Sequence, residues 1–304
     1  MRTCHLLIVL GCVFLFGCAG GASVTPADHA GKPVVYVVNE PLRQFAAAIA
    51  GTDLDLRPSY TKQGDPAFAE PDDALLQGLQ QADLLVLNGA GYEKWREGLS
   101  LPASIQVNTS VGYELIATEA STAHRHGAGA AHQHGDTAFT TWMDYRQAAA
   151  QVRMLGEALA GLVPERASAY LQASAEVQTQ LLELDAEMAA LAQQIGDRPL
   201  IVSHPVYQYW ARRYGVNVRA LHWEPDVVPD AAALAELATL RDGFPAEWMI
   251  WEGEPLAASV AALEQLGVRS VVVDPGGNAE GDWFRLQHDN LERLRQAFVS
   301  GGLP

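Results

Sequence analysis

Histidine and acidic side chains follow every predicted strand in the second half of the chain. The four strand ends are followed by His204, by His222-Trp223-Glu224, by Glu252-Gly253-Glu254 and by Asp274. Because the carboxyl ends of parallel strands meet at one edge of a sheet, these side chains are expected to lie close together. A single residue of this kind is usually a helix cap or a surface group. Two histidines with two carboxylates, in register at one edge, form a plausible ligand set for zinc or manganese.

A second group of histidines lies in residues 117–137, where the regular pattern of the chain is interrupted. It consists of two His-X-His pairs, formed by His124, His126, His132 and His134. Each pair can offer imidazoles to a borderline cation, whereas the glycines and alanines between the pairs cannot hold a rigid cage. The tract therefore predicts a metal-collecting loop. The alternative interpretation is a low-complexity surface loop.

The elements that must position these residues alternate regularly between strands and helices. In the first half we predict strands at 34–38, 54–57, 83–87, 105–107 and 114–116, with helices at 41–50 and 72–81. In the second half we predict strands at 199–203, 218–221, 248–251 and 270–273, with helices at 205–214, 230–241, 255–266 and 282–298. This alternation is typical of α/β units with a mainly parallel sheet that helices cover on both faces.

One helix predicted over 164–196 is much longer than the others. Pro164 suits its first position and Gly196 its end, with no Gly or Pro between them. One seam of alternating four- and three-residue spacings runs along it: Val177, Leu181, Leu184, Met188, Leu191 and Ile195. The seam is too short for an extended coiled coil. We therefore predict a rigid backbone helix that joins two α/β lobes, 33–163 and 197–304.

The first residues resemble an export signal. An apolar run within residues 1–18 ends at Leu15-Phe16-Gly17-Cys18, which is similar to the lipobox of bacterial lipoproteins. We expect Cys18 to carry lipid and residues 19–32 to form a flexible tether. The alternative is an ordinary secretory signal that is cut elsewhere. Cys4 and Cys12 are lost with the signal in either case, so an internal disulfide is excluded.

The balance of charges restricts the partners. The chain has 20 Lys and Arg against 36 Asp and Glu, a formal net charge of −16. An acidic surface gains nothing from nucleic acid or anionic lipid, so neither is predicted as a binding partner. A cation is the more natural ligand.

Several motifs in the chain resemble one known family, the metal-binding solute-binding proteins of ABC importers, which are zinc and manganese receptors of the bacterial cell envelope. The motifs are Gly64-Asp65-Pro66 with Glu70-Pro71, Ala82-Asp83-Leu84 with Asn88-Gly89 and Glu93-Lys94-Trp95, the histidine-rich tract, Trp142-Met143-Asp144, Ala211-Arg212-Arg213-Tyr214-Gly215, and Val273-Asp274-Pro275. The resemblance covers essentially the whole chain after the signal. It implies a monomer of two lobes joined by a rigid helix, with a metal ion held between the lobes by three histidines and one carboxylate.

The chain departs from this family at two of the four implied ligands. Ala67 follows Asp65-Pro66 where the family has histidine, and Thr140 stands where another histidine is expected. His204 and Asp274 fall at the other two ligand positions, and Glu252 matches an acidic position that the family often fills. Either the second lobe and the histidine loop hold most of the metal, or the site has changed its ligand.

The leading functional hypothesis is a lipoprotein on the periplasmic side of the cell envelope. It would bind zinc, with manganese or another divalent transition metal as the alternative, and deliver the ion to an ABC permease in the membrane. The second hypothesis is a receptor-like protein that has lost metal transport and binds a small solute, a metal chelate or a partner protein. An enzyme is not predicted, because no Ser/His or Cys/His nucleophile arrangement accompanies His204, Glu252 and Asp274.

Overall fold

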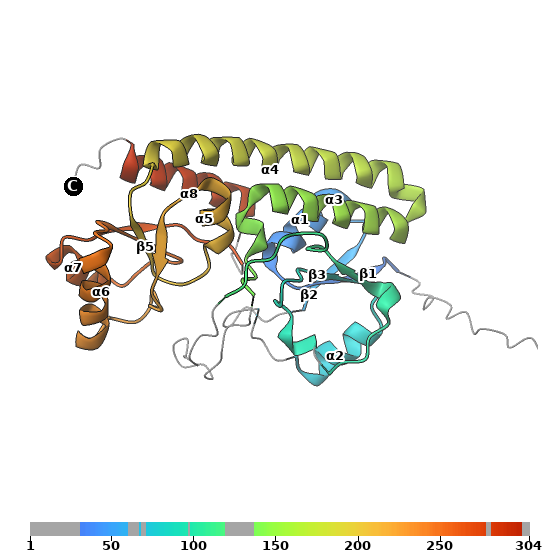
Figure 1. Ribbon diagram of the computed structural model, residues 1–304. Coiled ribbons are helices and arrows are strands. Elements are labelled where there is room, and N and C mark those ends of the chain that lie inside the picture. The colour runs from blue at the N-terminus through green and yellow to red at the C-terminus, as the bar shows by residue number, and fades with distance from the viewer. Residues whose placement is uncertain are drawn as a thin grey trace, which may run out of the picture.

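The chain folds into two α/β lobes that lie side by side along one long helix (Figure 1). The computed structural model describes residues 31–59, 67, 71–96, 98–118, 137–277 and 281–299. Residues 1–30, which include the predicted signal and Cys18, and most of the predicted histidine loop lie outside these ranges. The described architecture confirms the predicted fold class.

The first lobe contains a parallel sheet with strand order β2-β1-β3-β4. The strands are β1 (Val34–Val37), β2 (Asp55–Pro58), β3 (Leu84–Leu87) and β4 (Gln106–Asn108). Its helices are α1 (Glu40–Ala50), α2 (Asp73–Gln80) and α3 (Tyr145–Leu162), and α2 lies on the side of the sheet away from α1 and α3 (Figure 1). The central strands β1 and β3 are apolar throughout because both faces of the sheet are covered.

The second lobe repeats this topology with strand order β6-β5-β7-β8, again all parallel. The strands are β5 (Leu200–Val202), β6 (Val218–Ala220), β7 (Trp248–Trp251) and β8 (Arg269–Val272). The helices are α5 (Gln208–Tyr214), α6 (Ala231–Gly243), α7 (Ala257–Gln265) and α8 (Trp283–Phe298). Both sheets thus place their first and third strands at the centre.

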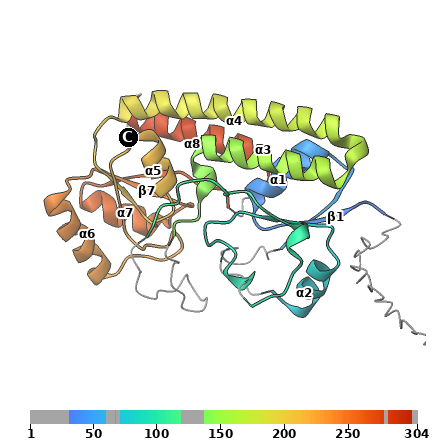
Figure 2. The same ribbon diagram turned by 45° about the vertical axis from the view of Figure 1, so that its right-hand side comes forward.

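The long helix α4 (Ala167–Ile195) runs along one side of both lobes, as the two views agree (Figures 1 and 2). Its 29 residues give a length of about 43 Å at about 1.5 Å per residue. Every residue of the predicted seam is buried: Val177, Leu181, Leu184, Met188, Leu191 and Ile195. Helices α1 and α3 of the first lobe and α5 and α8 of the second pack against it.

One continuous apolar core passes through the first lobe, α4 and the inner face of the second sheet, while a separate core fills the outer face of that sheet. Strand β7 shows the division, because Ile250 belongs to the first core and Met249 and Trp251 to the second. Successive side chains of a strand point to opposite faces, so one strand serves both cores.

Helices α3 and α4 approach each other closely at one glycine. A Cβ atom at Gly156 would lie 2.5 Å from the Cβ of Ser174, which is closer than two carbon atoms can pack. The Ser174 hydroxyl donates a hydrogen bond across the contact to the carbonyl of Val152, at 3.0 Å. The sequence therefore requires a small residue on each helix where they meet.

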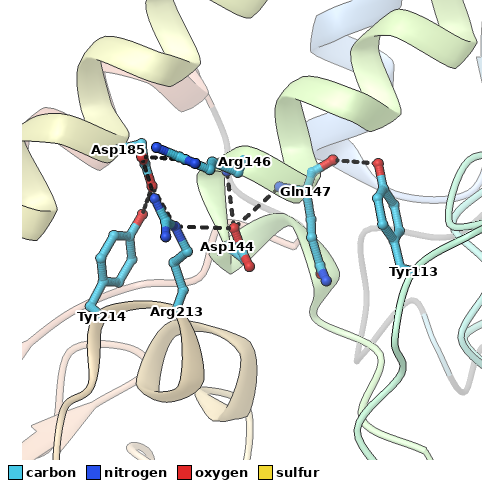
Figure 3. A network of polar contacts seen from close by, with 7 residues as sticks. All are labelled: Tyr113, Asp144, Arg146, Gln147, Asp185, Arg213 and Tyr214. Atoms are coloured by element: carbon cyan, nitrogen blue, oxygen red, sulfur yellow. Dashed lines mark hydrogen bonds and ion pairs between the residues drawn. The ribbon is translucent and has the colours of Figure 1, made fainter.

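A buried carboxylate, that of Asp185, interrupts the apolar face of α4 and joins the lobes (Figure 3). The Arg213 guanidinium of α5 donates to both of its oxygens, at 2.8 and 2.6 Å. Arg146 of α3 donates to it at 3.1 Å, and the Tyr214 hydroxyl at 3.2 Å. Although burial alone would raise the pKa of Asp185, hydrogen bonds from Arg213 and Arg146 hold it below its ordinary value.

Most predicted bounds shift by one or two residues, α5 begins at Gln208 instead of at residue 205, and two further elements differ from the sequence predictions. The long helix begins at Ala167, because Pro164–Arg166 forms a separate 3-10 turn closed by the Arg166 N–H and the Val163 carbonyl. Residues 114–116 form no strand, and an isolated antiparallel bridge between Ala117 and Thr137 lies next to them instead. Within the described ranges, this segment does not extend the sheet beyond its edge strand β4.

Replacing Asp185 by Ala should lower the free energy of unfolding by about 3 kcal/mol, because it leaves the partly buried Arg213 guanidinium without its bidentate partner. The matched control is Asp55→Ala, which removes an exposed ion pair with Arg57 and should cost no more than about 1 kcal/mol. Chemical denaturation of the purified variants measures both. Equal losses in the two variants would contradict the anchoring role of Asp185.

Candidate metal centre

The loops that follow the strands of the second sheet begin in register at one edge. Hydrogen bonds of the parallel ladder continue past the strands, with the Ser203 N–H donating to Ile250 and the Trp223 N–H to Ser203, both at 2.8 Å. The Val273 N–H donates likewise to Trp251, at 2.9 Å. The residues after the strands are thereby held at the same edge, as the sequence predicts for parallel strands.

Three of the predicted ligands come together at this edge: His204 after β5, Glu224 after β6 and Glu252 after β7. One ligand atom from each lies within 4.8 Å of the corresponding atoms of the other two. The His204 side chain is buried, and the carboxylates of Glu224 and Glu252 are partly exposed. The group therefore has one face toward solvent through which an ion can enter.

The spacing of the group fits a single small cation. The Nδ1 atom of His204 and the Oε1 atom of Glu224 are 3.6 Å apart. Two ligands of one tetrahedral zinc ion, each bonded at about 2.1 Å, are about 3.4 Å from each other. A carboxylate oxygen of Glu252, the third residue, lies within 4.8 Å of the other two ligand atoms. Small side-chain rotations would bring it to about the same separation. One imidazole and two carboxylates also provide the nitrogen and oxygen ligands that divalent transition metals accept.

The other three predicted ligands are also described by the structure but lie outside this group: His222, Glu254 and Asp274. His222 is exposed, with its ring centroid 5.7 Å from that of His204 and the rings nearly perpendicular. Glu254 is also exposed, and it precedes the turn into α7. Asp274 follows β8, as predicted, but its carboxylate caps a local turn by accepting the N–H of Gly276 at 2.7 Å.

Asp274 is further held by Asn290 of α8, whose amide bonds to both its backbone N–H and its carbonyl. Burial raises the pKa of Asp274, against the opposing effects of the Gly276 N–H and the Arg293 charge. The hydroxyl of Tyr207 is buried nearby and donates to the Val273 carbonyl at 2.7 Å. Burial raises the Tyr207 pKa well above its ordinary value, and the charges of Glu252 and Asp274 raise it further.

The sequence prediction treats Tyr207, Trp223 and Trp251 as packing residues, and all three are buried. Tyr207 also has a polar role that the prediction missed, because its protonated hydroxyl fixes the chain just before Asp274. A tyrosine five residues after the end of β5 gives no signal of that bond, since its acceptor is the carbonyl that follows a different strand, β8.

The two positions at which the chain departs from the resembled family hold no ligand for an ion. Ala67 is buried and has no ligand atom. Thr140 is buried, and its hydroxyl donates to the Val206 carbonyl at 2.6 Å. All three grouped ligands therefore come from the second lobe.

The strand ends of the first lobe carry a different chemistry. They are followed by the buried residues Asn39, Ser59, Asn88 and Thr109. The amide oxygen of Asn88 accepts hydrogen bonds from Thr141 and Gln151, at 3.1 and 3.2 Å. The buried Glu93 carboxylate accepts the N–H groups of Asn88 and Gly89, while burial raises its pKa to about 7. These groups build the turns of the lobe.

The four histidines of the predicted loop, His124, His126, His132 and His134, lie outside the described residues, but both ends of the loop are described. Ala117 and Thr137 pair as an antiparallel bridge, and the Ala138 N–H donates to the Ile116 carbonyl at 2.8 Å. The Tyr209 hydroxyl of α5 accepts from the Ile116 N–H and donates to the Ala138 carbonyl. The base of the loop is thus attached to the second lobe.

Comparison with known proteins identifies the family. The zinc-uptake complex component A family of periplasmic proteins matches residues 35–297. The chain belongs to this family. The family resemblance predicted from the sequence motifs, to the metal-binding solute-binding proteins of ABC importers, is thereby confirmed for this chain.

Individual relatives are similar at low identity. The high-affinity zinc uptake system protein ZnuA of Bacillus subtilis is 25% identical over 243 residues, which are 77% of this chain and 76% of that protein. The zinc-binding lipoprotein AdcA of Streptococcus pneumoniae is 23% identical over 312 residues, which cover 97% of this chain but only 61% of AdcA. The chain therefore spans about three fifths of the length of that relative.

Solved structures show the same fold. The crystal structure of the Zn(II)-bound ZnuA-like domain of Streptococcus pneumoniae AdcA superposes with a TM-score of 0.74 at 20% identity, covering 88% of this chain and 99% of that domain.

Among the described helices, none is long and apolar enough to cross a membrane.

The grouping of ligands makes a specific prediction for zinc binding. Glu252→Gln and His204→Ala should each weaken zinc binding by about 100-fold or more, because each removes one of three ligands. Glu254→Gln is the matched control, since Glu254 lies two residues from Glu252 but is exposed and outside the group; it should change the affinity by less than about twofold. Titration against a competing chelator measures all three. A Glu254→Gln variant as weak as Glu252→Gln would contradict the assignment of the ligands.

Proposed function

We propose that this protein binds a divalent transition metal ion, zinc in the first place, and delivers it to an ABC importer in the membrane. The observation that carries the proposal is the group formed by His204, Glu224 and Glu252 at the carboxyl edge of the second sheet. Membership of the zinc-uptake family supports zinc as the cargo. Manganese is the alternative cargo, because carboxylate ligands suit it as well.

The arrangement suits reversible capture. The imidazole of His204 is 1% exposed and sits on a loop whose backbone is bonded to neighbouring strands, so it is preorganised. The two carboxylates are partly exposed, and they can approach an ion as it loses its water. No proton transfer or covalent step is required of any of these groups, which agrees with a carrier.

We further propose that the histidine loop collects ions for this site. Its base is attached to α5 through Tyr209, and α5 follows the loop that carries His204. Two His-X-His pairs at such a place would raise the local concentration of metal near the carboxylates. The final site would need no ligand from the loop.

A zinc titration of the protein lacking residues 1–18, with a competing chelator, tests these proposals together. We expect one tightly bound ion per chain and further weaker ones, and deletion of residues 125–133 should remove the weaker ions only. Loss of the tight ion on deletion would mean that loop histidines complete the site. If the protein with its complete histidine loop binds no zinc, the metal-binding function is contradicted and a receptor for another ligand is favoured.

We also propose that the protein is anchored by lipid on Cys18, on the periplasmic side of the envelope. The support is the Leu15-Phe16-Gly17-Cys18 motif at the end of an apolar run. A carrier held at the membrane stays close to its permease.

Replacing Cys18 by Ser should move the protein from the membrane fraction to the soluble fraction, because a lipoprotein signal needs that thiol. Ser23→Ala, a change in the same tether, is the control and should leave the distribution as it is. Fractionation of cells followed by immunoblotting gives the result. A Cys18→Ser variant that stays with the membrane contradicts lipid attachment at this position.

A further inference from the structure

The segment that leads into α3, residues 138–144, lies between the lobes and is hydrogen-bonded to α5 and to two loops of the second lobe. The Tyr209 hydroxyl donates to the Ala138 carbonyl at 2.9 Å, and the Thr140 hydroxyl donates to the Val206 carbonyl at 2.6 Å. The Trp142 indole N–H donates to the Pro275 carbonyl at 2.9 Å. Each of these bonds is buried, so each is shielded from competition with water.

The Thr140 bond ends two residues from a proposed ligand. Val206 is itself bonded back to His204, because its N–H donates to the His204 carbonyl at 2.9 Å. The peptide groups that follow His204 are therefore held at one end by the strand ladder and at the other by the Thr140 hydroxyl. At 2.6 Å this is a short bond for a hydroxyl donor, and Thr140 is only 4% exposed.

We propose that Thr140 is a positioning residue for metal binding, whose hydroxyl holds the His204 loop in the conformation that accepts the ion. This inference rests on the proposed function, and it assigns to Thr140 a role that is not that of a ligand. The hydroxyl oxygen faces the Val206 carbonyl as a donor. A threonine hydroxyl is also a poor ligand for zinc, whereas it is a good donor to a carbonyl.

The expected effect on affinity follows from the equilibrium of the loop before the ion arrives. If the loop loses its bond to Thr140, only a fraction of the metal-free molecules has His204 in place, and the apparent affinity is the intrinsic affinity multiplied by that fraction. Loss of one buried hydrogen bond corresponds to a binding-competent fraction of about one tenth. Zinc should therefore bind about tenfold more weakly.

The test compares variants of two adjacent threonines. Thr140→Val removes the hydroxyl at nearly constant volume and should weaken zinc binding about tenfold. Thr141→Val is the matched control, because Thr141 is equally buried but donates to Asn88 of the first lobe; its zinc affinity should stay that of the wild type. Thr140→Ser keeps a hydroxyl and should restore the affinity. Thr140→Ala provides the same comparison if Thr140→Val fails to fold.

Hydrogen exchange gives a readout that a general loss of stability would not produce. In the metal-free Thr140→Val protein, the Val206 amide should exchange faster than in the wild type, and zinc should restore its protection. In Thr141→Val this amide should exchange as in the wild type. The exchange is followed for the same purified proteins that are used in the zinc titration.

Two results would overturn the inference. Thr140→Val and Thr140→Ala that bind zinc as tightly as the wild type would show that the hydroxyl does not position His204. A wild-type protein that binds no zinc would contradict the proposed function and this inference together, so the two failures are distinguishable.

Discussion

The apolar face of α4 is buried along its length, and residues of both lobes pack against it in one continuous core. A hinge between the lobes would have to expose part of this core, at roughly 25 cal/mol for each Å² of apolar surface. Asp185 lies in the middle of the same face. Its carboxylate accepts hydrogen bonds from Arg146 of α3 and Arg213 of α5, so it joins the two lobes. Large changes in the angle between the lobes are therefore costly, and the lobes behave as one body.

Because the lobes are held together, entry of an ion into the proposed site would depend on movements of individual loops and not of whole lobes. The three residues of the proposed metal site all follow strands of one sheet, so the proposed site needs no ligand from the first lobe. The first lobe instead acts through the segment before α3, which bonds to the loops after β5 and β8. Ligand loops that are held from both sides lose less conformational freedom when the ion binds.

The sequence predicted the parts of this structure that depend on periodicity. The seam of α4 and the alternation of strands with helices follow from the spacing of apolar residues, and the site edge follows from the direction of parallel strands. The choice among the candidate ligands could not be predicted, because it depends on local bonds. Asp274 is turned toward the Gly276 N–H, and only the position of that N–H decides it. Nor could the spacing of residues show that Arg213, some 28 positions along the chain, meets Asp185.

The two sheets have the same strand order, yet their equivalent edges differ in charge. In the first lobe the residues after the strands are two amides and two hydroxyls, which carry no charge. In the second, the group contains the two carboxylates of Glu224 and Glu252 beside the imidazole of His204. Two ionised carboxylates at the proposed site would be balanced by a divalent ion, whereas a monovalent or trivalent ion would leave a net charge. Because an uncompensated charge in a partly buried place is costly, such a site would select the valence of its ion before bond lengths select the element.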